Sequence, residues 1–354
     1  MKIGIVNDYL EYAGGEYFCH LLIEGLKKLG HEAEMITPPT DNSGEGAPDP
    51  KTILEKIAEY KPDLIHFNNI GRVGLIPVHY AIHHNIPHIL TVHDYWPVCK
   101  TRILLSDNFQ ICETARWIEC KNCKSGLSNL PDPPKMAVML NRITKVVQSN
   151  YQKRVLKRFD YDEKKIEVIR LGIKLDQYLP NFEGKHDFVW SGRFHLEKGL
   201  PFYMKLAELF PQYNFYVTGG GTEVQVNDFG KTKPLGKIPY PELYKLYQDS
   251  IAYVLTSIWP EIAGYTQLEA QALGTPIIGF NVGAVPEYVA DEKGGLLVDR
   301  GDLVQLADAV KYLAENSTVV EEMGRGARAN MEKFSIDKTV EKYVSVYRNE
   351  LKKG

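Results

Sequence analysis

The sequence has no long hydrophobic run and no excess of either charge. No stretch approaches the roughly 18 consecutive apolar residues of a membrane-spanning helix. Lys and Arg number 42 against 45 Asp and Glu, and the net charge of -3 argues against a generic binder of nucleic acid, which has to neutralise many phosphates. Residues 1–8 form a short strand-like segment and lack the long apolar region of a signal peptide. These absences together predict a soluble protein of the cytoplasm.

Cysteines are few and odd in number. A total of five suits a reducing compartment better than a framework of disulfides. Cys19 lies on the apolar face of a predicted helix, where we expect it to be a core residue. The other four fall within one irregular stretch, at Cys99, Cys112, Cys120 and Cys123. Four thiolates and a C-x-x-C pair suit a structural zinc ion, but the spacing is also compatible with free thiols or with one pair that forms a disulfide.

The chain is long enough for a little over two domains of about 150 residues each. Short apolar runs, such as 3–6, alternate with amphipathic segments, such as 15–29. Strands that are continuously apolar and separated by helices indicate a parallel sheet with both faces covered. The alternation pauses at the polar segment 173–186, which we interpret as a linker, and then resumes. We therefore predict an α/β protein with two Rossmann-like, doubly wound domains, residues 1–172 and 173–335, facing each other across a cleft.

Three glycine-rich turns follow predicted strands and are candidate anion sites. Gly14 and Gly15 open the first helix, where free backbone N–H groups can bind a phosphate, although a plain tight turn explains them as well. Arg193 and Lys198 lie in a Gly-bounded turn, and a guanidinium together with an ammonium favours a diphosphate site over a solvated loop. The third turn, 219–221, has three consecutive glycines, and simple flexibility explains it equally well.

Two carboxylates flank a loop that leads into a predicted helix. Thr266 is a candidate N-cap, which leaves Glu261 in the loop and Glu269 about one turn inside the helix. Carboxylate oxygens accept strong hydrogen bonds from sugar hydroxyls, and the helix N-terminus favours an anion. The pair is therefore a candidate site for a sugar and a phosphate, and two ordinary glutamates of a loop and a helix face are the alternative.

The order of these motifs resembles one enzyme family. The N-terminal Gly-Gly, His93-Asp94 after a strand of the first domain, the G-R-x-x-x-x-K-G segment and the E-x7-E motif follow each other as in retaining glycosyltransferases of the GT-B fold, family 4 (GT4). The resemblance covers essentially the whole chain. It implies that residues 1–172 bind the acceptor, that a final helix at 336–354 packs back on them, and that residues 173–335 bind a nucleotide-sugar donor.

The resemblance also implies roles for individual residues. Arg193 and Lys198 would hold the donor diphosphate, and His93 would lie beside the reacting sugar. Glu261 would contact hydroxyls of the transferred sugar, and Glu269 would bind the nucleotide ribose. The remaining implied donor contacts are Gly15, Gly221, Lys237, Ile238, Gly264, Tyr265 and Thr266.

The activity implied by the resemblance is transfer of a sugar, with retention, from a UDP- or GDP-sugar to a hydroxyl acceptor such as a lipid-linked sugar or a polysaccharide. Arg193 and Lys198 would stabilise the leaving diphosphate, so no cofactor is expected for catalysis. Two alternatives use the same phosphate cations: a sugar-nucleotide epimerase of the GT-B fold and a non-catalytic nucleotide-sugar-binding protein. His93 and the Glu261/Glu269 pair separate these readings, because a pure sensor has less need of a set of groups for the donor sugar and the acceptor side.

A local excess of positive charge is hidden in the balanced total. Between Arg142 and Lys174, ten Lys and Arg oppose four Asp and Glu. Such a stripe can dock on an anionic membrane surface, as a lipid-linked acceptor would require, and a solvated helix face is the alternative. Peripheral membrane contact through the first domain is therefore an open expectation.

Overall fold

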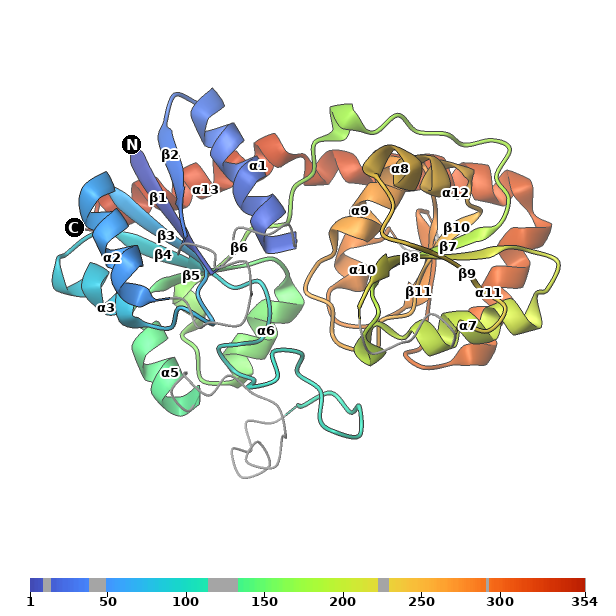
Figure 1. Cartoon of the computed structure of the whole chain (residues 1–354), viewed down its shortest axis with the longest axis horizontal. Helices are drawn as coiled ribbons and strands as arrows, with labels where there is room; N and C mark the ends of the chain where they lie inside the picture. Colours follow the sequence, from blue (N-terminus) through green and yellow to red (C-terminus); the bar gives the residue numbers. More distant parts are fainter. Residues whose placement is uncertain (9–13, 38–48, 114–132, 222–228, 291–292, 354) are drawn as a thin grey trace. The chain divides into compact units, whose positions relative to one another are not determined.

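The computed structural model describes residues 1–8, 14–37, 49–113, 133–221, 229–290 and 293–353. The chain divides into two compact units, Met1–Gly172 with Ile336–Gly354, and Ile173–Ser335. Each unit contains a six-stranded sheet, and the described strands pair parallel with their neighbours (Figure 1).

The sheet of the first unit has the order β2-β1-β3-β4-β5-β6. Its strands are β1 (Lys2–Asn7), β2 (Glu32–Ile36), β3 (Leu64–Asn69), β4 (His88–Thr91), β5 (Thr144–Val147) and β6 (Ile166–Val168). The helices of this unit are α1 (Gly14–Lys28), α2 (Pro50–Tyr60), α3 (Ile76–His83), α5 (Pro133–Leu140), α6 (Asn150–Arg158) and α13 (Ile336–Leu351). Every residue of β3 and β5 is buried, as expected for strands that are covered on both faces.

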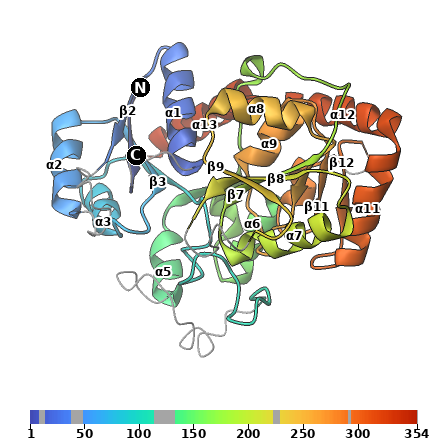
Figure 2. The same ribbon diagram turned by 45° about the vertical axis from the view of Figure 1, so that its right-hand side comes forward.

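The sheet of the second unit has the order β12-β11-β10-β7-β8-β9. Its strands are β7 (Phe188–Arg193), β8 (Phe215–Gly220), β9 (Lys233–Gly236), β10 (Ala252–Leu255), β11 (Ile277–Phe280) and β12 (Gly295–Val298). Its helices are α7 (Leu200–Leu209), α8 (Tyr240–Asp249), α9 (Tyr265–Ala272), α10 (Val285–Tyr288), α11 (Leu303–Glu315) and α12 (Ser317–Met331). Helices α8, α9 and α12 cover one face of this sheet, and α7 and α11 cover the other (Figure 2). The two parallel sheets confirm the predicted α/β class with Rossmann-like units.

Several helices begin where a side chain satisfies their free backbone N–H groups. At the start of α11, Asp302 Oδ1 accepts hydrogen bonds of 2.9 Å from the backbone N–H groups of Val304 and Gln305. At the start of α6, Ser149 Oγ accepts one of 3.0 Å from the backbone N–H of Gln152. Such caps stabilise a helix by about 1 kcal/mol each, so these two boundaries are set by local sequence.

The last helix packs against the first unit, beside α1 (Figures 1 and 2). Gly25 of α1 permits this close approach, because a Cβ at that position would lie 2.4 Å from Val340 Cγ2 of α13. His66 of β3 joins the helix to the sheet: its Nδ1 lies 2.8 Å from the hydroxyl of Tyr347, and its Nε2 lies 2.7 Å from Thr91 Oγ1. These contacts satisfy polar groups that are buried between α13 and the sheet.

Residues 173–186 do not form a free linker, so that prediction is wrong. The backbone N–H of Ile173 donates to the carbonyl of Phe334 at 2.8 Å, within the second unit. Ile173 and Tyr178 are buried, with exposed fractions of 0% and 1%. The polar composition of the segment concealed these two apolar anchors, which hold it against the second unit.

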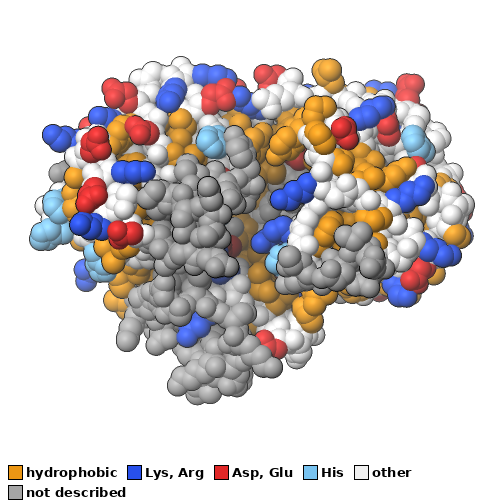
Figure 3. Space-filling view, in the orientation of Figure 1, with side chains coloured by type: hydrophobic (Ala, Val, Ile, Leu, Met, Phe, Trp, Pro, Cys, Tyr) orange, Lys and Arg blue, Asp and Glu red, His pale blue; other side chains and the backbone are white. Residues whose placement is uncertain are grey.

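The basic stripe between Arg142 and Lys174 exposes fewer unpaired positive charges than its sequence suggests. Lys145 is completely buried, and its Nζ donates to the carbonyls of Leu140 and Ile143 at 2.8 Å each. Lys157 forms an ion pair of 2.6 Å with Glu163. Basic and acidic side chains are intermixed over the first unit on the face drawn in Figure 3. Among the described helices, none is both long enough and apolar enough to traverse a bilayer.

The buried position of His66 predicts a specific loss of stability in acid. Burial lowers the pKa of His66 from 6.5 to about 3, so the unfolded chain takes up a proton near pH 6.5 while the native protein does not. The contribution of neutral His66 to the free energy of unfolding is therefore complete above pH 6.5. It decreases by about 1.4 kcal/mol per pH unit as the pH falls toward 3.

We expect the free energy of unfolding, measured with urea, to fall between pH 7 and pH 5.5 by about 1 kcal/mol more in the wild type than in His66→Gln. Glutamine keeps a donor and an acceptor but does not titrate. An equal loss of unfolding free energy in both proteins would show that His66 does not stay neutral in the native protein.

Candidate functional site

The second unit collects its predicted site residues at the carboxyl ends of β7 and β8. These strands end side by side, with Gly192 paired to Gly219 and Arg193 paired to Gly220. Gly219 has a φ of 128°, and a Cβ there would lie 1.9 Å from the carbonyl oxygen of Gly192. Only glycine fits this approach, which leaves the edge of the sheet free of side chains next to Arg193. Arg193 itself is exposed and has no ion-pair partner among the described residues.

Lys198 is positioned by the glycine that follows it. It ends a 3-10 turn, Leu196–Lys198, and Gly199 then adopts a left-handed φ of 70°. A Cβ at Gly199 would lie 1.8 Å from the carbonyl oxygen of Thr256, at the end of β10, so the turn lies directly against that strand end. Lys198 Nζ donates to Glu261 Oε1 at 2.7 Å and lies 4.7 Å from the ring centre of Trp259. The structure thus brings together the predicted phosphate cation and the predicted sugar carboxylate.

Glu261 is buried, with an exposed fraction of 4%, and one of its oxygens accepts two hydrogen bonds. Its Oε1 accepts from Lys198 Nζ at 2.7 Å and from Ser257 Oγ at 2.6 Å. Among the described residues, Oε2 has no hydrogen-bond partner, so it is the oxygen that can accept from a ligand. The motifs in the sequence did not point to Ser257. The one signal that could have found it is its position four residues before Glu261.

Helix α9 begins one residue after Gly264, which is its N-cap. The predicted N-cap, Thr266, is therefore wrong: it is the second residue of the helix, after Tyr265. The helix starts early because Gly264 is extended, and the hydroxyl of Thr266 instead lies 3.0 Å from the hydroxyl of Tyr253 on β10. The same Tyr253 hydroxyl lies 2.8 Å from the carbonyl oxygen of Ser191, so α9 is tied to the end of β7.

Glu269 lies just over one turn inside α9 and is almost completely buried, with an exposed fraction of 5%. Burial raises its pKa from 4.5 to about 7, and the hydroxyl of Tyr178, 3.4 Å from Oε1, opposes this shift. Tyr178 belongs to the segment that had been interpreted as a linker. A carboxyl group with a pKa near neutrality in this place can hold a hydroxyl or give up its proton without large cost.

The residues predicted to meet the nucleotide base adjoin the same edge. Lys237 and Ile238 follow β9, and a Cβ at Gly220 would lie 3.1 Å from Lys237 Cε, so the stem of this lysine passes over the end of β8. Gly221 lies equally close to the backbone of Phe194, because a Cβ there would be 2.8 Å from its nitrogen. Packing against backbone thus requires glycine at 219 and 221, and flexibility alone does not explain these two.

The first unit places His93 just after β4, between two amide side chains that the sequence did not point to. His93 Nε2 lies 2.6 Å from Asn68 Oδ1, and His93 Nδ1 lies 2.6 Å from Gln148 Nε2. Burial lowers the pKa of His93 from 6.5 to about 3. Gly15, in the first turn of α1, accepts from Asn68 Nδ2 through its carbonyl at 3.3 Å, so the Gly-Gly turn and His93 share one partner.

Two aspartates hold the loops around His93. Asp8, after β1, accepts from the backbone N–H groups of Arg72 and Val73 at 2.9 Å each, and burial raises its pKa to about 6. Asp94 accepts from the backbone N–H of Trp96 at 2.7 Å and from the guanidinium of Arg102. Both carboxylates are fully occupied by loop contacts, which suits a role in holding backbone rather than in binding a ligand.

The predicted zinc ligands lie only partly within the described residues. Cys99 and Cys112 are both free thiols, and Cys99 Sγ lies 3.1 Å from Thr101 Oγ1. Cys120 and Cys123 lie outside the described residues. In the part of the chain that the structure describes, no group of three side chains could hold a metal ion. The zinc prediction is therefore untested.

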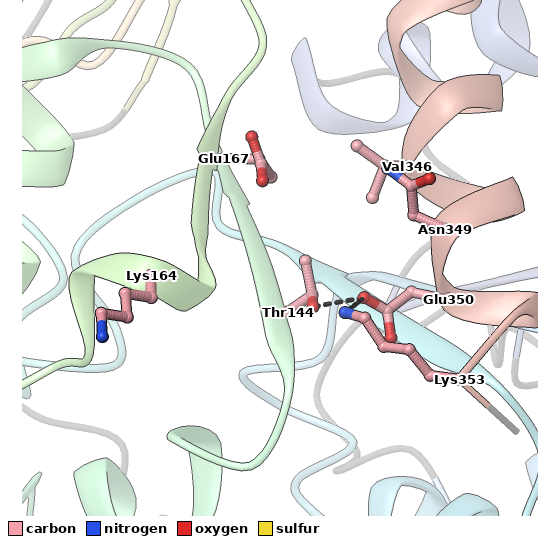
Figure 4. A pocket seen from close by; sticks show the side chains of 7 residues that line it. All are labelled: Thr144, Lys164, Glu167, Val346, Asn349, Glu350 and Lys353. Carbon is pink, nitrogen blue, oxygen red and sulfur yellow. Dashed lines mark hydrogen bonds and ion pairs between the residues drawn. The ribbon is translucent and has the colours of Figure 1, made fainter.

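A pocket of about 330 Å³ in the first unit lies away from these groups (Figure 4). It is lined by Thr144, Lys164, Glu167, Val346, Asn349, Glu350 and Lys353. Glu350 at its edge already accepts from Lys353 at 2.6 Å and from Thr144 at 2.5 Å. The pocket adjoins the amino ends of β5 and β6, whereas ligands of such sheets bind at the carboxyl ends.

Two family models match the sequence of this chain. The model of "Glycosyl transferases group 1" matches residues 173–330, and that of "Glycosyltransferase Family 4" matches residues 45–177. The D-inositol 3-phosphate glycosyltransferase of Paenarthrobacter aurescens (strain TC1) is 25% identical over 221 residues, which is 55% of this chain and 54% of that protein. The chain therefore matches about half the length of this curated relative.

Solved structures share the fold of the whole chain. Sucrose-phosphate synthase (tll1590) from Thermosynechococcus elongatus superposes with a TM-score of 0.80 at 18% identity, and the match covers 100% of both chains. Anabaena Alr3699/HepE in complex with UDP-glucose superposes with a TM-score of 0.73 at 16% identity, over 98% of this chain and 100% of that one. Two family models in sequence over residues 45–330, on two Rossmann-like units, show that this chain belongs to glycosyltransferase family 4.

Proposed function

We propose that the protein transfers a sugar, with retention, from a nucleotide diphosphate donor to a hydroxyl acceptor. The observation that carries the proposal is the contact between Lys198 and Glu261, because it joins a cation suited to a diphosphate to a carboxylate suited to a sugar. Membership of the family supports the same reaction. The second unit would bind the donor, and the first unit would bind a carbohydrate or lipid-linked acceptor.

Cleavage of the sugar–phosphate bond leaves negative charge on the diphosphate. Arg193 and Lys198, at the ends of β7 and of the turn that follows it, would stabilise this charge, and preorganised charges of this kind are a large catalytic contribution. The positive end of the helix dipole of α9, which begins at Tyr265, would add to it. A uridine diphosphate sugar is the first donor to test, because the related Anabaena protein was solved in complex with UDP-glucose.

The two carboxylates would hold the two sugars of the donor. Glu261 Oε2 would accept from a hydroxyl of the transferred sugar, while Lys198 and Ser257 hold Oε1. Glu269 would accept from hydroxyls of the ribose. In the retaining reaction the acceptor attacks from the face of the leaving group, whose phosphate can take the acceptor's proton, so the proposal requires no dedicated protein base.

We expect Lys198→Ala to lower turnover at least about a hundredfold, because the leaving diphosphate loses a fixed cation. The matched control is Lys205→Ala: Lys205 also forms an ion pair of 2.7 Å with a glutamate, Glu208, but lies exposed on α7. Donors are first ranked by thermal shift across UDP-, GDP- and ADP-sugars, and turnover is then measured with the donor that stabilises most.

Near-normal turnover of a folded Lys198→Ala protein would contradict the proposal that Lys198 stabilises the leaving diphosphate. A product that is an isomer of the donor, formed without acceptor, would indicate an epimerase instead. Binding of a donor with no product in the presence of a range of acceptors would indicate a binding protein.

Ser257→Ala is expected to lower kcat/KM at least about tenfold, because Glu261 loses a charged hydrogen bond that fixes its orientation. Ser257→Thr retains the hydroxyl and is expected to restore most of the activity. Ser250→Ala is the matched control, since Ser250 is equally buried and its Oγ donates to the carbonyl of Leu246 at 2.7 Å, in the same unit. Equal losses in Ser257→Ala and Ser250→Ala would show that Ser257 acts only on stability.

We also propose that the cysteines at 99, 112, 120 and 123 bind a structural zinc ion. The clustering of these four cysteines and the C-x-x-C pair support this, and neither Cys99 nor Cys112 is part of a disulfide among the described residues. Elemental analysis of the purified protein is expected to find about one zinc per chain, and the variant Cys123→Ser is expected to lose it. Cys19→Ser, at a buried thiol on α1, is the control that keeps the metal. Less than about a tenth of an equivalent in the wild type would reject the site.

A further inference from the structure

His93 belongs to a row of polar side chains that crosses the carboxyl edge of the first sheet. The members come from α1 and from four neighbouring strand ends, and we call them the His93 relay: Glu16, Asn7, Asn68, His93 and Gln148. Successive members are joined by hydrogen bonds of 3.0, 2.9, 2.6 and 2.6 Å. The other four members of the relay are buried, with exposed fractions of 4% or less.

The relay has a direction that begins at Glu16. A carboxylate oxygen can only accept, so Glu16 Oε1 receives the N–H of Asn7 Nδ2 at 3.0 Å. The amide of Asn7 is thereby oriented with Oδ1 toward Asn68, where it accepts from Asn68 Nδ2 at 2.9 Å. Asn68 Nδ2 also donates to the carbonyl of Gly15 at 3.3 Å, which fixes the second amide in the same sense.

This direction determines where the proton of His93 lies. With its Nδ2 used for donation, Asn68 presents Oδ1 to the histidine, and His93 Nε2 must donate to it across 2.6 Å. His93 Nδ1 then carries a lone pair and accepts from Gln148 Nε2 at 2.6 Å. Both ring nitrogens are engaged by the protein, so the imidazole has no free lone pair with which to take a proton from an acceptor.

The surroundings of His93 also disfavour a positive ring. The Phe18 ring lies against it with a centroid distance of 5.2 Å, and burial lowers the pKa of His93 to about 3. Titratable and charged groups on the adjoining elements include Glu16 and Cys19 on α1, Asp8 after β1, His66 on β3, Asp94 next to His93, Arg170 after β6 and Tyr343 on α13. Asp94 is paired with Arg102, and His66 is itself neutral, since its pKa is about 3.

We propose that the relay fixes His93 as a neutral imidazole protonated on Nε2, and that Asn68 and Gln148 are positioning residues for sugar transfer. The proposal rests on the transferase function proposed above, because a retaining transfer makes the reacting sugar cationic in the transition state. The family resemblance implies a position for His93 beside that sugar, where a neutral ring would add no repulsion and an imidazolium would oppose the developing charge. The relay also ties His93 to the Gly15 turn, so both keep one geometry.

The first test is nitrogen-15 NMR of the protein labelled at histidine, with the His93 signals identified by their absence in His93→Gln. In the wild type we expect the pattern of a neutral ring with the proton on Nε2, unchanged from pH 8 to about pH 5. The signals of His66, which is buried on the same sheet, report that the fold is intact. Titration of His93 between pH 5 and 8, or a proton on Nδ1, would overturn the proposal.

Two variants of Gln148 separate the relay from the general environment. Gln148→Glu places a carboxylate at Nδ1, which favours the imidazolium and is expected to raise the pKa of His93 by about 1 to 3 pH units. Gln148→Met has a similar length without a polar group, and His93 should then keep its proton on Nε2, because Asn68 still accepts it. An unchanged His93 in Gln148→Glu, or a change of tautomer in Gln148→Met, would contradict the direction of the relay.

The pH profile of kcat distinguishes a positioning role of Gln148 from an effect on stability alone. In Gln148→Glu, kcat is expected to fall on the acid side of its pH profile and to recover as the pH rises, while Gln148→Met shows no such limb. A lower kcat at all pH values in both variants would show a merely structural role. If NMR confirms the relay but the wild-type protein transfers no sugar, the proposed function fails and the relay stands.

Discussion

Parallel pairing of the strands is the constraint on which both candidate sites depend. Because the described strands of each sheet run in the same direction, the residues that follow them gather at one edge. Arg193, Gly219 and the loop that leads to Glu261 meet at this edge in the second unit. Asn68, His93 and Gln148 meet at the corresponding edge in the first. None of these groups is close in sequence to all of its partners, and the sheets bring them together.

The two edges hold their candidate site residues with different chemistry. In the second unit, the ion pair of Lys198 and Glu261 is short at 2.7 Å, and Ser257 fixes the carboxylate from the other side. In the first unit, neutral amides hold a neutral histidine. Charges in the second unit and neutral dipoles in the first would suit the proposed reaction, in which the leaving group becomes negative and the sugar becomes positive.

Glycine sets the shape of the carboxyl edge of the second sheet. Gly199 and Gly219 have left-handed or strongly extended backbones with positive φ, and a Cβ at either would lie within 2 Å of a carbonyl oxygen of a neighbouring strand end. These contacts place Lys198 and Arg193 on backbone that cannot shift without breaking the sheet. Helix α9 is attached to the same edge through Tyr253, so its N-terminus and the backbone that carries the two cations belong to one edge of the sheet.

The sequence by itself determined the α/β class and most strands, because buried parallel strands need continuous apolar runs that are visible without a structure. It also pointed to Lys198, Glu261 and Glu269, through the family resemblance that the order of the motifs carries. It did not predict β9, whose four residues are all exposed, because an edge strand needs no apolar pattern. Only the tertiary structure decided which groups hold the sites: Ser257, Asn68 and Gln148 are ordinary polar residues until the sheets bring their partners within hydrogen-bonding distance. A hydrogen bond between residues far apart in the chain has no local signature, and that is why these positioning contacts had to be seen in three dimensions.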